Sequence, residues 1–245
     1  MKIIFAMAGA SSRFTSAGYK VPKYMLPLQN KSVFFHAVSG FARYFNAIEF
    51  IFVYRDLCNT KDFIHTECKK MGLEDFKAVE LHSLTQGQAQ SVYNALCALK
   101  ISDDERILIF NIDTFRVDFT LPNCFDLEQI DGYLEVFRGE GEQWSFVLPK
   151  DEILRKVAQT AEKKCISPLC SSGLYYFRRV ADFKAVFESI RKKSETTKGE
   201  YYIAPMYNAL IAQGKDIRYY EIATNQIIFC GTPQEYENLK SKDRK

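Results

Sequence analysis

Residues 6–28 read AMAGASSRFTSAGYKVPKYMLPL, and this stretch decides the fold. An apolar run from Lys2 to Met7 leads into it, and such a run is typical of a strand buried on both faces of a parallel sheet. Small residues follow, then a single arginine, then a lysine with a proline on either side. Phosphate groups bind to backbone amides and to cations, so we expect this stretch to hold the phosphates of a nucleotide.

Two kinds of residue in this stretch carry that expectation. Small side chains leave the backbone amides accessible to a triphosphate, while a guanidinium offers a planar fork and an ammonium offers a compact charge. The competing interpretation is a tight strand-to-helix connection with a surface arginine and lysine. The expected nucleotide-binding residues are Ala8, Gly9, Ala10, Ser11 and Ser12, with Arg13 and Lys23 as the cations.

The composition limits the classes of protein that fit. With 245 residues, 47% of them hydrophobic and 26% charged, the chain can bury a large core, and we expect one compact unit. A net charge of +3 without a basic stripe argues against nucleic-acid binding. No apolar stretch approaches a membrane span, and the N-terminal run is too short for a signal peptide. Seven cysteines without a CxxC pair indicate free thiols, so we expect a cytoplasmic protein.

Strand and helix patterns alternate up to about residue 113. The expected strands span 2–7, 48–54, 76–81 and 106–110, and the expected helices span 32–44, 61–71 and 89–99, with Ser32 as an N-cap. This alternation predicts a doubly wound parallel sheet, in which ligands bind beyond the carboxyl ends of the strands. At that edge we expect three loops to gather, at 8–23, 82–88 and 111–114.

Short strand patterns separated by turn signals dominate the second half of the chain. They predict a mixed or antiparallel extension of the sheet. The expected strands are 132–138, 144–148, 153–157, 174–177, 217–222 and 226–229, and the expected helices are 182–192 and 200–213, with another helix opening at 232–235. No linker rich in proline, glycine or serine divides the chain, so we expect no hinge between separate domains.

Asp113 stands at the end of an apolar strand, where a carboxylate needs water, a cation or an amide. Beside a triphosphate site such an aspartate is a natural ligand for Mg²⁺, which commonly takes one or two carboxylates together with substrate phosphates. The competing role is that of a turn residue that stabilises the bend at Asp113-Thr114. The phosphate-binding stretch favours the metal.

Two further segments carry groups that suit a nucleotide and a sugar phosphate. Gln86-Gly87 precedes a helix, where glycine lets a planar base approach and an amide can bind its edge. An ordinary helix start explains the same two residues. Glu162-Lys163 combines a carboxylate that can accept hydrogen bonds from sugar hydroxyls with a lysine that can hold a phosphate. A solvated charge run is the alternative for that pair.

In order along the chain, these residues resemble the nucleotidyltransferase family that makes nucleotide sugars from a nucleoside triphosphate and a sugar 1-phosphate. Residues 8–13 and 22–28 match the family's GxGTR or GxGSR opening and its PKPMLPV segment. The other matches are the base-reading segment at 87–89, the metal aspartate at 113, the Glu-Lys-Pro segment at 162–164, the x-Thr-Gly-(Ile/Leu)-Tyr strand at 171–175, the Gly-Glu-Tyr-Tyr helix at 199–202 and the Gly-Thr-Pro turn at 231–233. They are collinear over nearly the whole chain.

The resemblance implies a fold and an activity. The implied fold is α/β, a Rossmann-like, doubly wound mixed sheet of the GT-A-like kind with a smaller β-rich acceptor-binding extension. It implies a single domain over 1–245, with a nucleotide-binding half at 1–120 and an acceptor-binding half at 121–245. The implied activity is Mg²⁺-dependent transfer of a nucleotidyl group to a sugar 1-phosphate, with release of pyrophosphate, for capsule or surface polysaccharide synthesis. A homo-oligomer is compatible with the sequence.

The resemblance also assigns catalytic and binding roles. Arg13 would hold the β- and γ-phosphates, Lys23 the charge that develops on the α-phosphoryl group, and Asp113 the Mg²⁺. Gln86 and Gly87 would lie at the base. The implied acceptor-binding residues are Ser145, Glu162, Lys163, Ser171 and Gly173, with Lys163 on the acceptor phosphate.

Three departures from the family pattern leave other functions open. Ser11 replaces the second glycine of the opening motif, Phe229 stands where a second metal aspartate is often found, and Trp144-Ser145 replaces a Tyr-Gly pair. The alternatives are a GT-A-type glycosyltransferase with its metal at residues 111–113, and a nucleotide-sugar-binding protein without turnover. A cytidylyltransferase for a non-sugar phosphate such as phosphocholine is a close variant.

Overall fold

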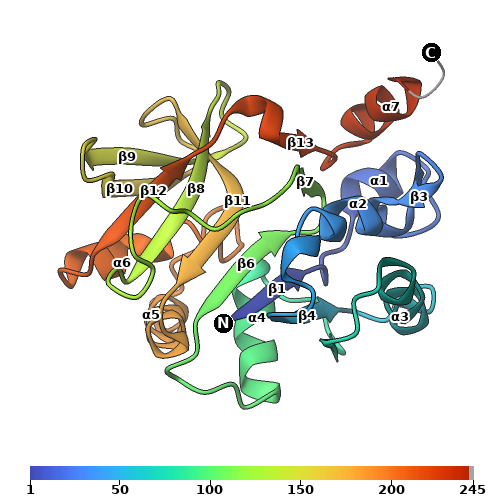
Figure 1. Ribbon diagram of the computed structural model, residues 1–245, viewed down its shortest axis with the longest axis horizontal. Coiled ribbons are helices and arrows are strands. Elements are labelled where there is room, and N and C mark those ends of the chain that lie inside the picture. Colours follow the sequence, from blue (N-terminus) through green and yellow to red (C-terminus); the bar gives the residue numbers. More distant parts are fainter. Residues whose placement is uncertain (243–245) are drawn as a thin grey trace.

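One nine-stranded mixed sheet runs through the computed structural model, which describes residues 1–242 (Figure 1). Its strand order is β5–β4–β1–β6–β11–β8–β12–β10–β9. The first four strands in this order are parallel to one another; they are β5 (Phe76–Glu80), β4 (Glu49–Tyr54), β1 (Lys2–Ala6) and β6 (Ile107–Asn111). Apart from their ends, β1, β4 and β6 are buried on both faces, as predicted for a parallel sheet between helices.

The remaining strands extend this sheet with mostly antiparallel pairing. They are β8 (Gly132–Arg138), β9 (Ser145–Asp151), β10 (Lys156–Glu162), β11 (Leu169–Phe177) and β12 (Ile217–Glu221). β11 pairs antiparallel with β6 and with β8, whereas β12 is parallel to β8. Because β11 joins the parallel strands to the others, a single sheet crosses from the first half of the chain to the second.

The two faces of the sheet are covered by different helices. Successive strand residues point to opposite faces, so Ile3 and Phe5 share a core with α2 and α3, whereas Ile4 shares a core with α4, α5 and α6. These helices are α2 (Val33–Ser39), α3 (Thr60–Met71), α4 (Gln88–Ala98), α5 (Val180–Lys192) and α6 (Met206–Ala212). Within residues 1–242, no helix is long and apolar enough to cross a membrane.

Short elements complete the fold beside the sheet. They are α1 (Ser12–Ser16), η1 (Lys23–Met25), β2 (Pro27–Leu28), β3 (Lys31–Ser32), η2 (Ala42–Tyr44), β7 (Thr114–Arg116), η3 (Thr224–Gln226), β13 (Ile227–Phe229) and α7 (Pro233–Lys242). β13 pairs antiparallel with β7, so Phe229 lies opposite Thr114. This ribbon brings a segment near the C-terminus next to the end of β6.

Most of the predicted elements are confirmed with shifted ends, and three are wrong in part. The strand expected at 153–157 starts only at Lys156, because Arg155 adopts a left-handed φ of 54° in the hairpin turn between β9 and β10. The helix expected at 32–44 ends at Ser39 and is followed by the 3-10 turn η2, although Ser32 caps it as predicted, accepting from the amide of Phe35 at 3.0 Å. The helix expected at 200–213 starts at Met206, because residue 201 is hydrogen-bonded to the loop before α4.

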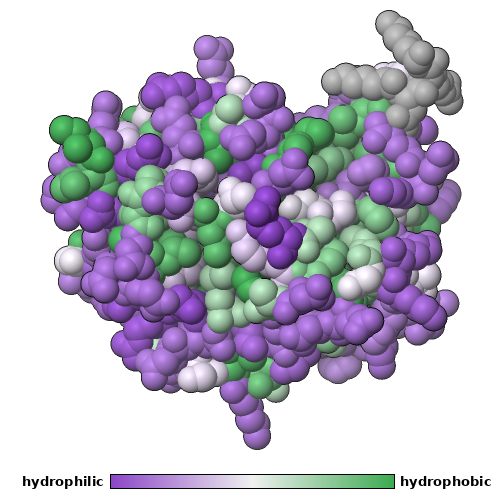
Figure 2. All heavy atoms as spheres, in the orientation of Figure 1, coloured by the Kyte–Doolittle hydropathy of each residue, from purple (hydrophilic) through white to green (hydrophobic). Residues whose placement is uncertain are grey.

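One face of the molecule is covered mostly by hydrophilic residues (Figure 2). A hydrophobic patch interrupts that surface at the free end of the β9–β10 hairpin. Two large apolar side chains are exposed in this turn, Ile153 at 93% and Leu154 at 49%.

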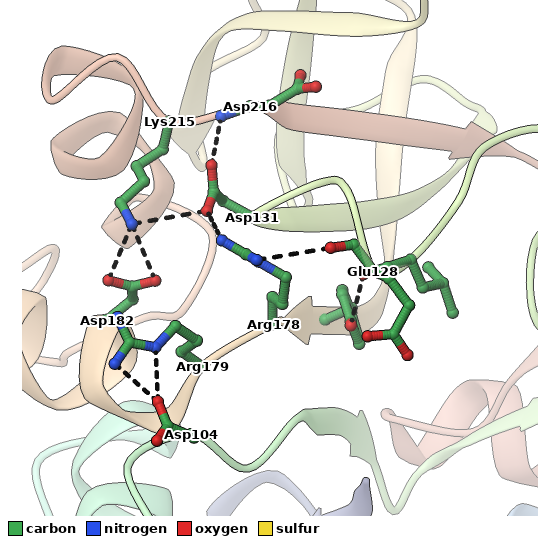
Figure 3. Close-up of polar contacts among 10 residues, drawn as sticks. Asp104, Glu128, Asp131, Arg178, Arg179, Asp182, Lys215 and Asp216 are labelled. Carbon is green, nitrogen blue, oxygen red and sulfur yellow. Dashed lines mark hydrogen bonds and ion pairs between the residues drawn. The ribbon is translucent and has the colours of Figure 1, made fainter.

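A charge network ties the end of β11 to the starts of β8, α5 and β12 (Figure 3). Arg178 Nη2 donates to Asp131 Oδ1 at 2.8 Å, and the amide of Asp216 donates to Asp131 Oδ2 at 2.9 Å. Lys215 Nζ lies 3.5 Å from Asp131 and 3.3 Å from Asp182. Burial acts to raise the pKa of Asp131, but the Asp216 amide and the two cations outweigh it and hold that pKa below its usual value.

We expect Asp131→Asn to lower the free energy of unfolding by about 1–2 kcal/mol at neutral pH, because an amide loses the charge-assisted bonds. A carboxylate whose folded-state pKa is depressed contributes stability above its unfolded pKa of about 3.9 and loses that contribution as the pH falls through the folded value. Denaturant titrations of both proteins should therefore show the difference shrinking in acid. A difference that is the same at all pH values would contradict this assignment.

Candidate functional site

A cavity of about 510 Å³ opens beyond the carboxyl ends of β1 and β6, between the two halves of the sheet. The loops at 8–23 and 111–114 meet there as predicted, together with part of the loop at 82–88. All but one of the predicted site residues line it: Ala8, Gly9, Ala10, Ser11, Ser12, Arg13, Lys23, Gly87, Asp113, Ser145, Glu162, Lys163, Ser171 and Gly173. The predicted nucleotide-binding residues, from Ala8 to Asp113, thus face the same space as the predicted acceptor-binding residues, from Ser145 to Gly173.

Gln86 is the candidate that the lining does not include. Its amide donates to Gln90 Oε1 at 2.6 Å, and its carbonyl accepts from the amide of Tyr201 at 2.7 Å. Gln88 lines the cavity in its place and donates from Nε2 to Asn111 Oδ1 at 2.8 Å. Gly87 has a φ of 105°, and a Cβ there would lie 2.7 Å from the carbonyl oxygen of Tyr201, so the neighbouring backbone itself requires glycine.

Ser11 sits at the turn into α1 with a left-handed φ of 51°. Glycine adopts this conformation without strain, whereas for another residue it costs about 1 kcal/mol of folding free energy. Ser11 therefore keeps the backbone shape of the glycine that the family motif has there. Its hydroxyl also accepts from the amide of Lys23 at 3.4 Å, which links the small-residue turn to the lysine segment.

Gly9 lies at the mouth of this turn, exposed, with open space where a Cβ would stand. The fold itself therefore accepts alanine, and only a ligand packed against the turn would exclude the methyl group. We expect Gly9→Ala to leave the melting temperature within about 2 °C while weakening nucleotide binding about tenfold. Calorimetric titration with nucleoside triphosphates measures the second effect, and unchanged affinity would place the triphosphate elsewhere.

Asp113 and Lys23 form an ion pair inside the cavity. Lys23 Nζ donates to Asp113 Oδ2 at 2.5 Å, and the two side chains are 25% and 19% exposed. Burial acts to raise the pKa of Asp113, but Lys23, the Asp113 backbone amide and the nearby Arg13 outweigh it and hold the pKa below its usual value. The carboxylate is therefore ionised at neutral pH and can bind a cation.

Another cation, Lys163, lines the same cavity on the side of the predicted acceptor-binding residues. Lys163 Nζ donates to the hydroxyl of Tyr202 and lies 4.4 Å from the centre of its ring. Burial and the neighbouring Glu200 raise the pKa of Tyr202 above its usual value, and Arg13 opposes them. Arg13 lines the same cavity as Asp113 and Tyr202, and its charge acts to lower the pKa of both.

Glu162 provides a carboxylate at the end of β10. It accepts a hydrogen bond from Ser145 Oγ, and burial followed by the charge of Glu200 raises its pKa, with Ser145 and Lys163 opposing the shift. Tyr175, whose pKa burial raises to about 12, lies close to the same carboxylate. This cluster of hydroxyl and carboxyl groups can form hydrogen bonds with a polyhydroxylated acceptor.

A bulge in β11 shapes the part of the cavity that contains the predicted acceptor-binding residues Ser171 and Gly173. Between Ser171 and Tyr175 the pairing with β8 shifts register, and Gly173 has a φ of 88°. This φ favours glycine, and a Cβ on Gly173 would lie 2.1 Å from Asn111 Nδ2, so the Asn111 side chain would have to move. The bulge turns the backbone of residues 171–173 toward the cavity.

Aromatic rings line the cavity beside Asp113. Phe229 and Trp144 lie with ring centres 4.5 Å apart, and Phe137 packs against both at 5.2 Å. Trp144 Nε1 donates to the carbonyl of Glu140 at 3.0 Å, which fixes the indole ring. Phe229, at the position where the family pattern often has a second metal aspartate, is therefore part of an apolar surface. The sequence showed the phenylalanine at this position but did not predict its contact with Trp144.

Within residues 1–242, no group of three or more His, Cys, Asp or Glu side chains forms a metal cluster. Asp113 is the ionised acid at the carboxyl end of β6. A further acid, Glu235, lines the cavity and accepts from the amides of Gly231 and Thr232, both at 2.9 Å, at the start of α7. One hard carboxylate ligand suits a Mg²⁺ ion that takes its other ligands from phosphates and water.

Several lining residues were not predicted as site residues from the sequence, among them Gln88, Glu200, Tyr202 and Glu235. Asn111 also lines the cavity and was considered only for the metal site of a glycosyltransferase. Gln88, Glu200 and Tyr202 belong to matched motifs, so the motif positions could have indicated them. Glu235 was predicted only as an acid near a helix N-terminus, and its approach to the site depends on the β7–β13 ribbon.

The chain is similar over nearly its whole length to nucleotidyltransferases of known structure. The chain aligns with the crystal structure of a nucleoside-diphosphate-sugar pyrophosphorylase from Vibrio cholerae RC9 at 42% identity and a TM-score of 0.91, over 98% of this chain and 100% of that chain. An inositol-1-phosphate CTP transferase from T. maritima aligns at 16% identity and a TM-score of 0.75, over 100% and 96% of the two chains. A UDP-glucose pyrophosphorylase complexed with UDP-glucose aligns at 14% identity and a TM-score of 0.74, over 99% and 98%.

The match at 42% identity shows the family of this chain. The other two matches, at 16% and 14% identity, show only that the mixed α/β fold is shared. A scan against protein-family models and a search of curated proteins gave no match. The chain belongs to the nucleoside-diphosphate-sugar pyrophosphorylase family and is a nucleotidyltransferase of the sugar-phosphate type.

Proposed function

We propose that this enzyme transfers a nucleotidyl group from a nucleoside triphosphate to a sugar 1-phosphate and releases pyrophosphate, with Mg²⁺ as its cofactor. The observation that carries the proposal is that Arg13, Lys23 and Asp113 line the same cavity as Glu162 and Lys163. Cations on both sides suit two phosphorylated substrates that must meet. Nucleotide sugars are the activated donors for polysaccharide assembly, so a surface polysaccharide is the proposed destination of the product.

In the proposed reaction, a phosphate oxygen of the acceptor attacks the α-phosphorus and the bond to the β-phosphate oxygen breaks. The acceptor phosphate is already anionic, so alignment and charge neutralisation replace a strong general base. Arg13 holds the departing β- and γ-phosphates, Lys23 neutralises charge at the α-phosphoryl group, and Lys163 holds the acceptor phosphate. Glu162 orients the sugar through its hydroxyls.

Asp113 is the residue that would hold Mg²⁺ in this scheme. Its depressed pKa keeps it ionised, and the cation would neutralise phosphate charge and favour the departure of pyrophosphate. The ion pair with Lys23 shows that this carboxylate already stabilises a positive charge in the protein alone. Asp113 can then share its negative charge between the ammonium and the metal.

The test is pyrophosphate release with each nucleoside triphosphate, combined with a panel of sugar 1-phosphates, phosphocholine and inositol 1-phosphate, with and without Mg²⁺. The proposal predicts turnover of at least one sugar 1-phosphate and loss of turnover when the metal is chelated. Turnover with phosphocholine alone would show that the acceptor is not a sugar 1-phosphate but another phosphorylated alcohol. Tight nucleotide binding without any product would support a binding protein. In a parallel assay with nucleotide sugars as donors, sugar transfer without pyrophosphate formation would support a glycosyltransferase.

A further inference from the structure

Arg116 of β7 and Glu135 of β8 form an ion pair in the interior, with side chains 1% and 0% exposed. Arg116 Nε donates to both carboxylate oxygens of Glu135, at 2.9 Å and 3.0 Å. Neither side chain lines the cavity. A buried ion pair adds little net stability, because both charges lose their water, and its known use is to favour one arrangement of the elements that it joins.

On one side, the pair holds the bulge of β11. Between Ser171 and Tyr175, β11 carries three residues where β8 carries only Glu135. Glu135 Oε1 accepts from Ser172 Oγ at 2.9 Å, and the same hydroxyl accepts from the amide of Leu174 at 3.3 Å. Glu135 therefore holds the irregular backbone that forms the acceptor side of the cavity.

On the other side, the pair holds the β7–β13 ribbon. Arg116 Nη1 donates to the carbonyl of Gln226 at 2.9 Å, and Gln226 immediately precedes β13. Phe229 of β13 lines the cavity, and the amide of the next residue, Cys230, donates to the carbonyl of Asp113 at 2.9 Å. One guanidinium thus connects Glu135 to the strand that carries Phe229.

We infer that Arg116 and Glu135 are positioning residues that hold the β11 bulge and the β7–β13 ribbon at a fixed separation, and so determine acceptor binding. The inference rests on the proposed function, because it assigns the bulge and Phe229 to the acceptor. In the described part of the chain, residues 8–23 form no hydrogen bond or ion pair with the side chains of Arg116 and Glu135, so the affinity for nucleotide should not depend on this pair.

The mildest test is Ser172→Ala, which deletes the hydroxyl that joins Glu135 to the bulge. Because Ser172 itself lines the cavity, the decisive test is the paired replacement Arg116→Met with Glu135→Leu, which changes no lining residue. It removes both charges together, so that no unpaired charge is left in the interior. Ser32→Ala is the matched control, because Ser32 is also a buried serine that donates to a carboxylate, that of Glu67, far from the acceptor side. All variants are full-length proteins, and their melting temperatures are measured first.

The expected result is a rise of at least about tenfold in the KM for the acceptor in Ser172→Ala and in the paired variant, with the Kd for nucleotide changed less than about twofold. Ser32→Ala should change neither constant. Equal changes in both constants, or no change in the acceptor KM, would overturn the inference.

Hydrogen exchange of the protein without substrate separates this inference from the proposed function. In both test variants, amides of segment 171–175 and segment 226–230 should exchange faster together, and in Ser32→Ala they should not. Faster exchange in the bulge alone would show that the two segments are not coupled and would overturn the inference, even if the panel identifies a substrate. If both segments exchange faster together but the enzyme turns over no acceptor in the panel, the proposed function is refuted, while the structural link between the two segments stands.

Discussion

Lys23→Ala is expected to lower kcat by about 10²- to 10³-fold, because its ammonium is assigned to the charge that develops in the transition state. The KM for nucleotide should change far less, since that charge is weaker in the bound ground state. Lys23 is also the largest favourable influence on Asp113, so the pKa of that carboxyl should move up toward its usual value. Steady-state kinetics and a carboxyl pKa from NMR measure the two effects.

Lys20→Ala is the matched control for this prediction. Lys20 is exposed in the same segment and does not line the cavity. It should retain the wild-type kcat, whereas Lys23→Arg should recover part of the activity lost in Lys23→Ala because a cation is restored. A Lys23→Ala enzyme that keeps more than about a tenth of the wild-type kcat would show that the assigned role is wrong.

Arg116→Met alone is expected to lower the free energy of unfolding by about 3–5 kcal/mol, because it leaves the buried carboxylate of Glu135 without its partner. Burial already raises the pKa of Glu135, and Arg116 opposes that shift. In the variant the folded-state pKa should rise further above the unfolded value of about 4.3, so its stability should fall as the pH rises between those two values. Denaturant titrations near pH 5 and pH 8 measure this slope.

The paired variant, Arg116→Met with Glu135→Leu, is the control for that stability loss. With both charges removed, most of the lost stability should return and the extra dependence on pH should disappear. If the single and paired variants were equally unstable, lost packing rather than the unpaired charge would be the cause.

The parallel half of the fold followed closely from local sequence. The apolar runs that became β1, β4 and β6 are buried on both faces, so their composition alone distinguished them from surface strands. The N-cap at Ser32 was predicted equally well, because capping depends on neighbouring residues only.

The errors came where distant contacts decide the conformation. Residues 200–202 have a helix-like motif, but residue 201 bonds to the loop before α4 and Pro205 precedes the start of the helix. The turn before β10 depends on a left-handed residue, Arg155, that no turn signal marked. The short β7 strand is paired with residues more than 100 positions away, so its three residues carried little local signal.

The candidate site shows the same division. Motif positions indicated fourteen lining residues, yet glycine is favoured at 173 by its φ of 88° in the bulge, and it is required at 87 by the backbone of Tyr201. The buried pair of Arg116 and Glu135 had no sequence signal, since isolated charged residues in strands usually face solvent. The pair forms only because the pairing of β7 with β13 and of β8 with β11 brings Arg116 and Glu135 together in the interior.

The most direct test of nucleotidyl transfer follows the oxygen between the sugar and its phosphate. A sugar 1-phosphate that the panel identifies as a substrate is labelled with ¹⁸O at the bridging C1 oxygen and incubated with the enzyme, Mg²⁺ and the matching triphosphate. Because the acceptor phosphate attacks the α-phosphorus, the label should remain in the nucleotide sugar and the pyrophosphate should carry none. Label in released phosphate, which requires cleavage of the C1–O bond, would contradict nucleotidyl transfer.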